Sequence, residues 1–175
     1  MGHLLSALLR PFGHLLTQKF SDKMLRAGDP APDFSLPDQS GNTLSLSDFH
    51  GKKLALYFYP KDNTPTCTEQ ACSLRDGMEG LKTKGITVIG VSADSERKHQ
   101  NFIRKFSLPF PLLADTEHKL ADAFGVWGEK TLFGRKYMGI HRVTFLIDEN
   151  GRIAQVIDKV DAQHHAKQIL QVWGM

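Results

Sequence analysis

The pattern of the whole chain is set by residues 53–82, KLALYFYPKDNTPTCTEQACSLRDGMEGLK, in which a strand runs directly into a helix. Residues 53–59 are apolar almost throughout, which is typical of a strand covered on both faces. Residues 64–82 predict a helix, because Thr64 can cap its start and Pro65 suits the first helical position. The start of this helix carries the two cysteines of the chain, Cys67 and Cys72.

The alternation of strands and helices continues to the end of the chain. Strands are predicted at 86–93 and 110–115, helices at 95–106 and 118–125, a hairpin at 142–148 and 152–158 around the turn ENG, and a last helix at 161–173. Apolar strands separated by helices indicate a mostly parallel central sheet flanked by helices, to which the hairpin adds an antiparallel edge. We therefore expect an α/β protein with a thioredoxin-like fold.

Composition and charge are those of one ordinary globular domain. The 175 residues are 41% hydrophobic and 23% charged, and no run of eighteen apolar residues occurs. Residues 1–26 hold four basic residues and one acidic residue, a net charge of +3, so the other 18 basic and 18 acidic residues balance. A balanced domain argues against a nucleic-acid-binding surface.

The first 25 residues differ from the rest, and we expect an N-terminal extension at 1–25 followed by one domain at 26–175. The extension is rich in leucine at roughly helical spacing, with Pro11 and Gly13 interrupting it. A transit peptide and a membrane-surface anchor are two interpretations. The third is a simple extension, with the domain starting near Met24.

Two cysteines are too few for a secreted disulfide scaffold and fit a reducing compartment such as the cytoplasm. A structural zinc site would need about four ligands, and no second cysteine pair exists. We therefore expect neither a metal nor an organic cofactor, and favour a catalytic use of the pair.

Cys67 falls at the third position of the predicted helix. Unpaired backbone N–H groups and the helix dipole favour an anion there, which suits a reactive thiolate, although a small buried residue is the simpler interpretation. Cys72 follows five residues later, so an intact helix would separate the two Cα atoms by about 8.6 Å. A disulfide needs them within roughly 7 Å, so its formation would unwind the helix, and a helix-favouring change such as Ser73→Ala should slow it.

The motif P-x-x-x-T-x-x-C, formed by Pro60, Thr64 and Cys67, and the motif C-T-x-Q-A-C at 67–72 resemble the peroxiredoxin family. The second motif resembles the bacterioferritin comigratory protein, or peroxiredoxin Q, branch of that family. Three further stretches are similar to this branch, at 28–38, 110–130 and 139–151. The resemblance extends from about residue 26 to residue 173.

The resemblance implies a role for each matching residue. Cys67 would be the peroxidatic cysteine and Cys72 the resolving cysteine. The Thr64 hydroxyl would bond the peroxide and the thiolate, and Pro60 would shield the pocket. Arg142, from GIHRVTF, would hold the thiolate and the peroxide oxygens, as its rigid fork of donors allows.

The implied activity is that of a thiol peroxidase in antioxidant defence and cell redox homeostasis. It would reduce hydrogen peroxide and organic hydroperoxides through a Cys67 sulfenic acid and a Cys67–Cys72 disulfide, recycled by thioredoxin or a similar dithiol. Members of the branch are often monomers. One rival is a thioredoxin-like disulfide oxidoreductase, against which the missing C-x-x-C counts. The other is a redox-responsive binding protein or holdase, which would need neither Thr64 nor Arg142.

Overall fold

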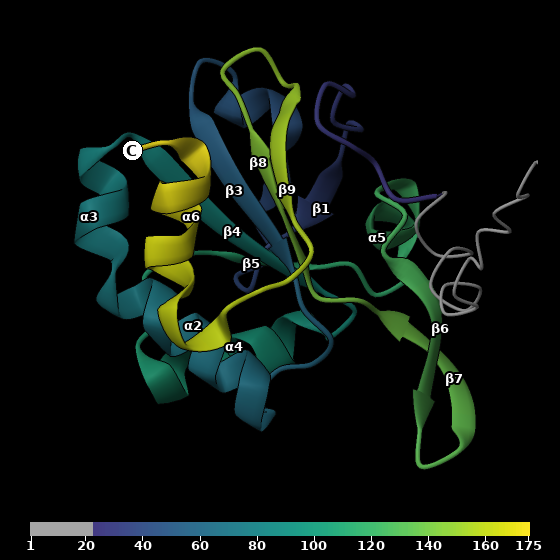
Figure 1. The fold of residues 1–175 in the computed structure, drawn as a ribbon. Coiled ribbons are helices and arrows are strands. Elements are labelled where there is room, and N and C mark those ends of the chain that lie inside the picture. The colour runs from purple at the N-terminus through teal and green to yellow at the C-terminus, as the bar shows by residue number, and fades with distance from the viewer. Residues whose placement is uncertain (1–22) are drawn as a thin grey trace, which may run out of the picture.

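A computed structural model describes residues 23–175 of the chain. Its centre is a five-stranded sheet with the strand order β5-β4-β3-β8-β9 (Figure 1). The strands are β3 (Lys53–Phe58), β4 (Ile86–Ser92), β5 (Leu112–Ala114), β8 (Val143–Ile147) and β9 (Ile153–Ile157). The helices are α2 (Pro65–Asp76), α3 (Met78–Thr83), α4 (Glu96–Phe106), α5 (Lys119–Ala123) and α6 (His165–Trp173), with short 3-10 turns at Leu46–Phe49 and Ala162–His164.

Four strands of this sheet, β3, β4, β5 and β9, run in the same direction, and β8 runs in the opposite direction. β3, β4 and β5 pair in parallel, whereas β8 is antiparallel to both β3 and β9. The predicted hairpin is therefore present, but it joins the sheet through β8 at the side of the central strand β3. The sheet is mixed for this reason, with two parallel and two antiparallel pairings.

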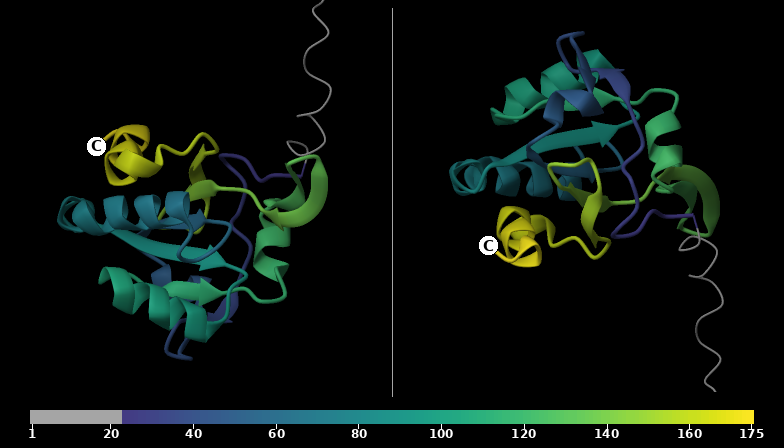
Figure 2. Two further views of the ribbon diagram at one scale, coloured as in Figure 1. Left: turned by 90° about the horizontal axis from the view of Figure 1, so that it is seen from below. Right: turned by 90° about the horizontal axis from the view of Figure 1, so that it is seen from above.

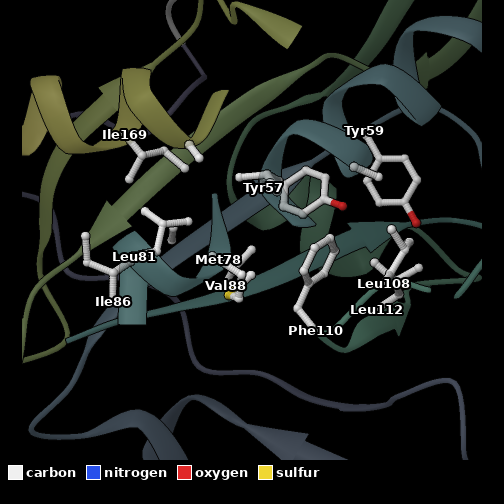
Figure 3. Close-up of a cluster of buried hydrophobic side chains, with 14 of the residues drawn as sticks. Tyr57, Tyr59, Met78, Leu81, Ile86, Val88, Leu108, Phe110, Leu112 and Ile169 are labelled. Carbon is white, nitrogen blue, oxygen red and sulfur yellow. The ribbon is translucent and has the colours of Figure 1, made fainter. Parts of the chain in front are cut away.

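Alternate residues of β3 feed two hydrophobic clusters on opposite faces of the sheet. Ala55 and Tyr57 face the cluster that α2, α3, α4 and α6 cover. Leu54, Leu56 and Phe58 face the cluster that α5 and the segment before β1 cover. Figure 3 shows the first cluster, in which the Tyr57 ring stacks on Tyr59 at 5.3 Å between centroids. The aromatic run of β3 is thus core.

Two residues that the sequence places at helix ends, Ser95 and Gly125, are found there in the structure. The Ser95 hydroxyl accepts a hydrogen bond from the Lys98 amide at the start of α4, as its N-cap role requires. Gly125, with φ +75°, follows α5, and a Cβ there would lie 2.0 Å from the Lys23 carbonyl oxygen. Only glycine fits at this close approach.

The helix predicted at 64–82 is divided at Gly77 into α2 and α3. A Cβ at Gly77 would lie 2.3 Å from the Cβ of Ala166 in α6, so the glycine allows these helices to pack closely. Figure 2 shows α6, in yellow, next to α2. Tertiary packing therefore explains a break that the helical pattern alone did not indicate.

Two additional hairpins were not predicted. β1 (Ser35–Pro37) pairs with β2 (Thr43–Ser45), and β6 (Trp127–Leu132) pairs with β7 (Arg135–Ile140). The β6–β7 hairpin projects from the body of the molecule (Figure 1). Most of its residues are exposed, so it lacks the alternation of buried and exposed residues that identifies a half-buried strand.

Met24 and Leu25, the last two residues of the expected extension, lie against the domain. Met24 and Leu25 pack against the second cluster, and the Leu25 amide donates to the Phe124 carbonyl oxygen at 3.2 Å. A domain start near Met24 fits this packing, while residues 1–22 lie outside the described part. Within residues 23–175, no helix has both the length and the apolar character needed to cross a membrane.

Candidate active site

The N-terminus of α2 holds Cys67 at its third helical position, after Pro65. The thiol is 2% exposed, lies against the first hydrophobic cluster and is not part of a disulfide. Backbone N–H groups of a first helical turn have no partner within the helix and point toward its start. The sulfur therefore lies where the backbone favours negative charge.

Arg142 contacts this sulfur from the short loop between β7 and β8. It directly precedes β8, the strand that pairs with β3. Its Nη2 donates to Cys67 Sγ at 3.1 Å, and its Nη1 donates to Gln70 Oε1 at 2.5 Å. The structure therefore brings together Cys67 and Arg142, which the resemblance had paired across 75 residues.

Gln70 is a residue of the site that the sequence analysis missed. It lies three positions after Cys67, so both side chains occupy the same face of α2. It is fully buried, and its Nε2 has no hydrogen-bond partner among the described residues. The signal that could have found it is this spacing, since a polar side chain one turn after a reactive cysteine shares its environment.

Thr64 and Pro60 border the same helix start from the loop after β3, and both are half-buried. Thr64 occupies the N-cap position, but its hydroxyl makes no capping bond and donates instead to the Lys61 carbonyl oxygen at 2.9 Å. The side-chain capping bond predicted for Thr64 is thus wrong, because the loop before α2 directs the hydroxyl toward the Lys61 carbonyl oxygen. Its oxygen lone pairs are not used by a helix amide.

Two further polar groups adjoin the Cys67–Arg142 pair. Lys130 of β6 donates to the Ile140 carbonyl oxygen at 3.0 Å, and burial, followed by the Arg142 charge, lowers the pKa of its ammonium. The buried Tyr57 hydroxyl has no hydrogen-bond partner among the described residues. Burial, with smaller effects of Asp62 and Cys67, raises the pKa of Tyr57 well above its ordinary value, so it remains a potential O–H donor.

Comparison with known proteins agrees with this geometry. Residues 27–156 match the AhpC/TSA family. The chain belongs to this family. It is 49% identical to peroxiredoxin Bcp of Escherichia coli K12 over 146 residues, which cover 83% of this chain and 94% of that relative. It is 50% identical to peroxiredoxin Bcp of Bacillus subtilis 168 over 147 residues, covering 84% and 94%.

Solved peroxiredoxins have the same fold. Peroxiredoxin Q of Xanthomonas campestris superimposes with a TM-score of 0.74 at 36% identity, covering 79% of this chain and 87% of that chain. Peroxidoxin BcpB of Mycobacterium tuberculosis superimposes with a TM-score of 0.75 at 33% identity, covering 85% and 96%. The predicted thioredoxin-like fold and the predicted peroxiredoxin branch are confirmed. The protein is a thiol peroxidase, an oxidoreductase that acts on peroxides.

A buried polar network holds the active-site loop of this peroxiredoxin in place. The Tyr59 hydroxyl donates to Asp62 Oδ1 at 2.5 Å, and His99 Nδ1 lies 2.6 Å from Asp62 Oδ2. His99 Nε2 lies 3.0 Å from the Leu113 carbonyl oxygen, so both ring nitrogens face acceptors. The Asp62 amide donates to Asp94 Oδ2 at 2.7 Å, which fixes the loop at its middle.

Cys72 lies further along α2, half-buried, and is also unpaired with any cysteine. Its neighbour Ser73 accepts from the His165 amide at 3.2 Å and donates to the Gln70 carbonyl oxygen at 2.9 Å. Ser73 therefore ties α2 to the start of α6. This tie reverses the expectation for Ser73→Ala, because losing a hydrogen bond worth about 1 kcal/mol outweighs a gain in helix propensity of a few tenths.

Metal-ligating side chains are not gathered at this site. In the described residues, no group of three or more histidine, cysteine, aspartate or glutamate side chains could hold a metal ion. His141, next to Arg142, turns its Nε2 to the Glu129 carbonyl oxygen at 3.3 Å. What the site does bring together is the Cys67 sulfur and the fixed N–H donors of Arg142.

Proposed function

We propose that Cys67 is the peroxidatic cysteine and Cys72 the resolving cysteine of this peroxidase, with Arg142, Thr64 and Pro60 forming the peroxide pocket. The observation that carries the proposal is the 3.1 Å contact between Arg142 Nη2 and Cys67 Sγ at the start of α2. A permanent cation and a helix N-terminus both favour the thiolate over the thiol.

In the first step, the Cys67 thiolate attacks one peroxide oxygen, the O–O bond breaks, and a Cys67 sulfenic acid forms. The departing oxygen carries the negative charge and takes a proton to leave as water or an alcohol. Donors fixed where this charge develops lower the barrier. Arg142 Nη2 already donates to Cys67 Sγ, and the Thr64 hydroxyl at the same helix start would turn from Lys61 to donate to the peroxide.

In the second step, the Cys72 thiol condenses with the sulfenic acid, water leaves, and a Cys67–Cys72 disulfide forms. Both residues belong to α2, so an intact helix holds their Cα atoms about 8.6 Å apart. The first turns of α2 must therefore unwind before the bond can close. Thioredoxin or a similar dithiol then reduces the disulfide by thiol–disulfide exchange.

Hydrogen peroxide and organic hydroperoxides are the proposed substrates. The bacterioferritin comigratory protein of Xanthomonas campestris, 35% identical over 79% of this chain, has alkyl peroxide reduction activity. We further infer a cytoplasmic, monomeric protein that binds no nucleic acid and acts in antioxidant defence. The electrical balance of residues 27–175 argues against a nucleic-acid surface, and a content of two cysteines fits a reducing compartment. The monomeric state is inferred from the family branch.

Stopped-flow oxidation of the reduced protein by hydrogen peroxide tests the proposal, with Trp127 and Trp173 as intrinsic fluorophores. Cys67→Ser should abolish turnover while the fold persists. Cys72→Ser should keep the first oxidation step and lose disulfide formation. Near wild-type turnover by Cys67→Ser would remove the central claim, and efficient insulin reduction without peroxide consumption would favour a disulfide oxidoreductase.

A further inference from the structure

The tip of the β6–β7 hairpin exposes apolar side chains to solvent. Phe133 is 97% exposed, and Leu132, Met138 and Tyr137 are 55%, 54% and 45% exposed. These four residues account for most of the large exposed hydrophobic side chains in the described chain, the others being Val172 and Met175. Large apolar groups concentrated on one projecting element mark a contact surface.

The backbone at the tip disfavours the residue that occupies it. Phe133 and Gly134 are the two central residues of the turn, with φ values of +49° and +77°. A two-residue turn with positive φ at both positions prefers Asn-Gly, whereas a bulky aromatic residue is strained there. Phe133 thus gains no packing and incurs backbone strain, which indicates that the residue serves something other than the fold.

The apolar side chains lie on both faces of the hairpin. Leu132 pairs with Arg135 and Lys130 pairs with Tyr137, so Leu132 and Tyr137 lie on one face. Met138 pairs with Glu129 on the opposite face, and Phe133 forms the apex. A protein partner would cover one face of such a ribbon, whereas a lipid bilayer surrounds an inserted tip. The arrangement therefore favours lipid.

Charge favours an anionic surface. The hairpin from 127 to 140 contains Lys130, Arg135 and Lys136 against Glu129, a net charge of +2. Lys136 lies 3.6 Å from Glu129, but both side chains are well exposed, so this pair is weak. Arg135 directly follows the tip. Basic residues next to an apolar tip bind anionic headgroups as the tip enters the interface.

The N-terminal segment joins the domain at the foot of the same hairpin. Leu25 bonds to Phe124, and Lys23 contacts Gly125, two residues before β6 begins at Trp127. The sequence before this point, residues 1–22, contains six leucines, and residues 1–26 carry a net charge of +3. The sequence that precedes the foot of the hairpin is thus also apolar and basic in composition.

We propose that the tip of the β6–β7 hairpin docks this peroxiredoxin on the surface of an anionic lipid bilayer. Insertion stops at the interface, because outward-facing backbone groups of a two-stranded ribbon need water as a partner. The hairpin is about 20 Å long, and its last residue, Ile140, lies two residues before Arg142, so docking holds the peroxide site close to the bilayer.

The test is co-sedimentation of the full chain with phosphatidylcholine vesicles that contain or lack phosphatidylglycerol. Phe133→Asn suits the turn, so its fold is retained, and it should weaken partitioning about tenfold, as expected for one buried aromatic side chain. Arg135→Gln should weaken it about fivefold on the anionic vesicles only. The matched control Val172→Thr, which alters an exposed apolar residue of α6, should change nothing.

A site-specific readout separates the tip from the N-terminal segment. Phe133→Trp should show a blue-shifted emission on anionic vesicles and quenching by brominated lipid, relative to the wild-type signal of Trp127 and Trp173. Hydrogen peroxide turnover in solution should be unchanged in all four variants. Equal partitioning of wild type and Phe133→Asn, or unshifted emission of Phe133→Trp, would overturn the proposal. If the wild type self-associates and Phe133→Asn does not, the hairpin tip binds a second copy of the chain and the bilayer proposal is overturned.

Discussion

Gln70→Leu tests whether the guanidinium of Arg142 must be held in place. In the structure, Gln70 Oε1 accepts from Arg142 Nη1, while Nη2 of the same group contacts Cys67. Leucine has a similar volume and no acceptor, so the substitution frees the guanidinium without opening a large cavity. A hydrogen bond to a charged group is worth about 1.5–3 kcal/mol.

If that loss falls on the transition state, oxidation of Cys67 slows by about 10- to 100-fold. The thermal stability of Gln70→Leu should not decrease together with its oxidation rate. Gln70 Nε2 is buried without a partner among the described residues, and leucine removes this unsatisfied donor. Arg142 loses its acceptor in the same variant, but it is half-buried and can bond to water instead. The melting temperature is therefore expected to change little while the rate falls.

The assay is the second-order rate constant for hydrogen peroxide from stopped-flow fluorescence, together with thermal unfolding of the same samples. Gln70→Met is the matched control, because it also removes the acceptor oxygen at a similar volume and should lose as much rate as Gln70→Leu. A rate for Gln70→Leu within twofold of wild type would refute the positioning role. A rate loss that merely accompanies a large loss of stability would do the same.

Further predictions concern Arg142, α2 and His165. Arg142→Lys should slow oxidation strongly, since one ammonium cannot reach both Cys67 and Gln70; a rate within twofold would make Arg142 structural. The oxidised protein should show faster amide exchange across α2 with the sheet still protected, and unchanged exchange in a disulfide-bonded sample would contradict the unwinding step. Ser73→Ala should accelerate disulfide formation without changing the first oxidation, as intact-mass kinetics can measure. Burial lowers the pKa of His165 to about 4, below its unfolded value near 6.5. The free energy of unfolding should therefore decrease as pH falls from about 6.5 to 4, by up to about 3 kcal/mol. Denaturant unfolding of His165→Gln should show a flatter dependence of this free energy on pH.

Much of the fold follows from local sequence signals, because apolar strands and capped helices are encoded over a few residues. The cap at Ser95 is one such signal, and the hairpin of β8 and β9 is another. The Cys67–Arg142 contact was anticipated through the family motifs, since spacing alone could not pair residues so far apart in the chain. Gln70 escaped notice because a glutamine within a helix is usually exposed.

Tertiary context decided the remaining features. The break at Gly77 depends on Ala166, which lies far along the chain. The hydroxyl of Thr64 turns to Lys61 because the loop, held through Asp62, bends in that direction. The β6–β7 hairpin consists mainly of exposed residues, so no burial pattern marks it.

The break at Gly77 also limits how far a redox event can spread through the molecule. α2 ends there, and α3 begins on the other side with its own buried residues, Met78 and Leu81. Strain from a Cys67–Cys72 bond would therefore be absorbed within one short helix. Met78 and Leu81 of α3 would keep their places in the first cluster while α2 unwinds, so repeated oxidation and reduction need not unfold the whole protein.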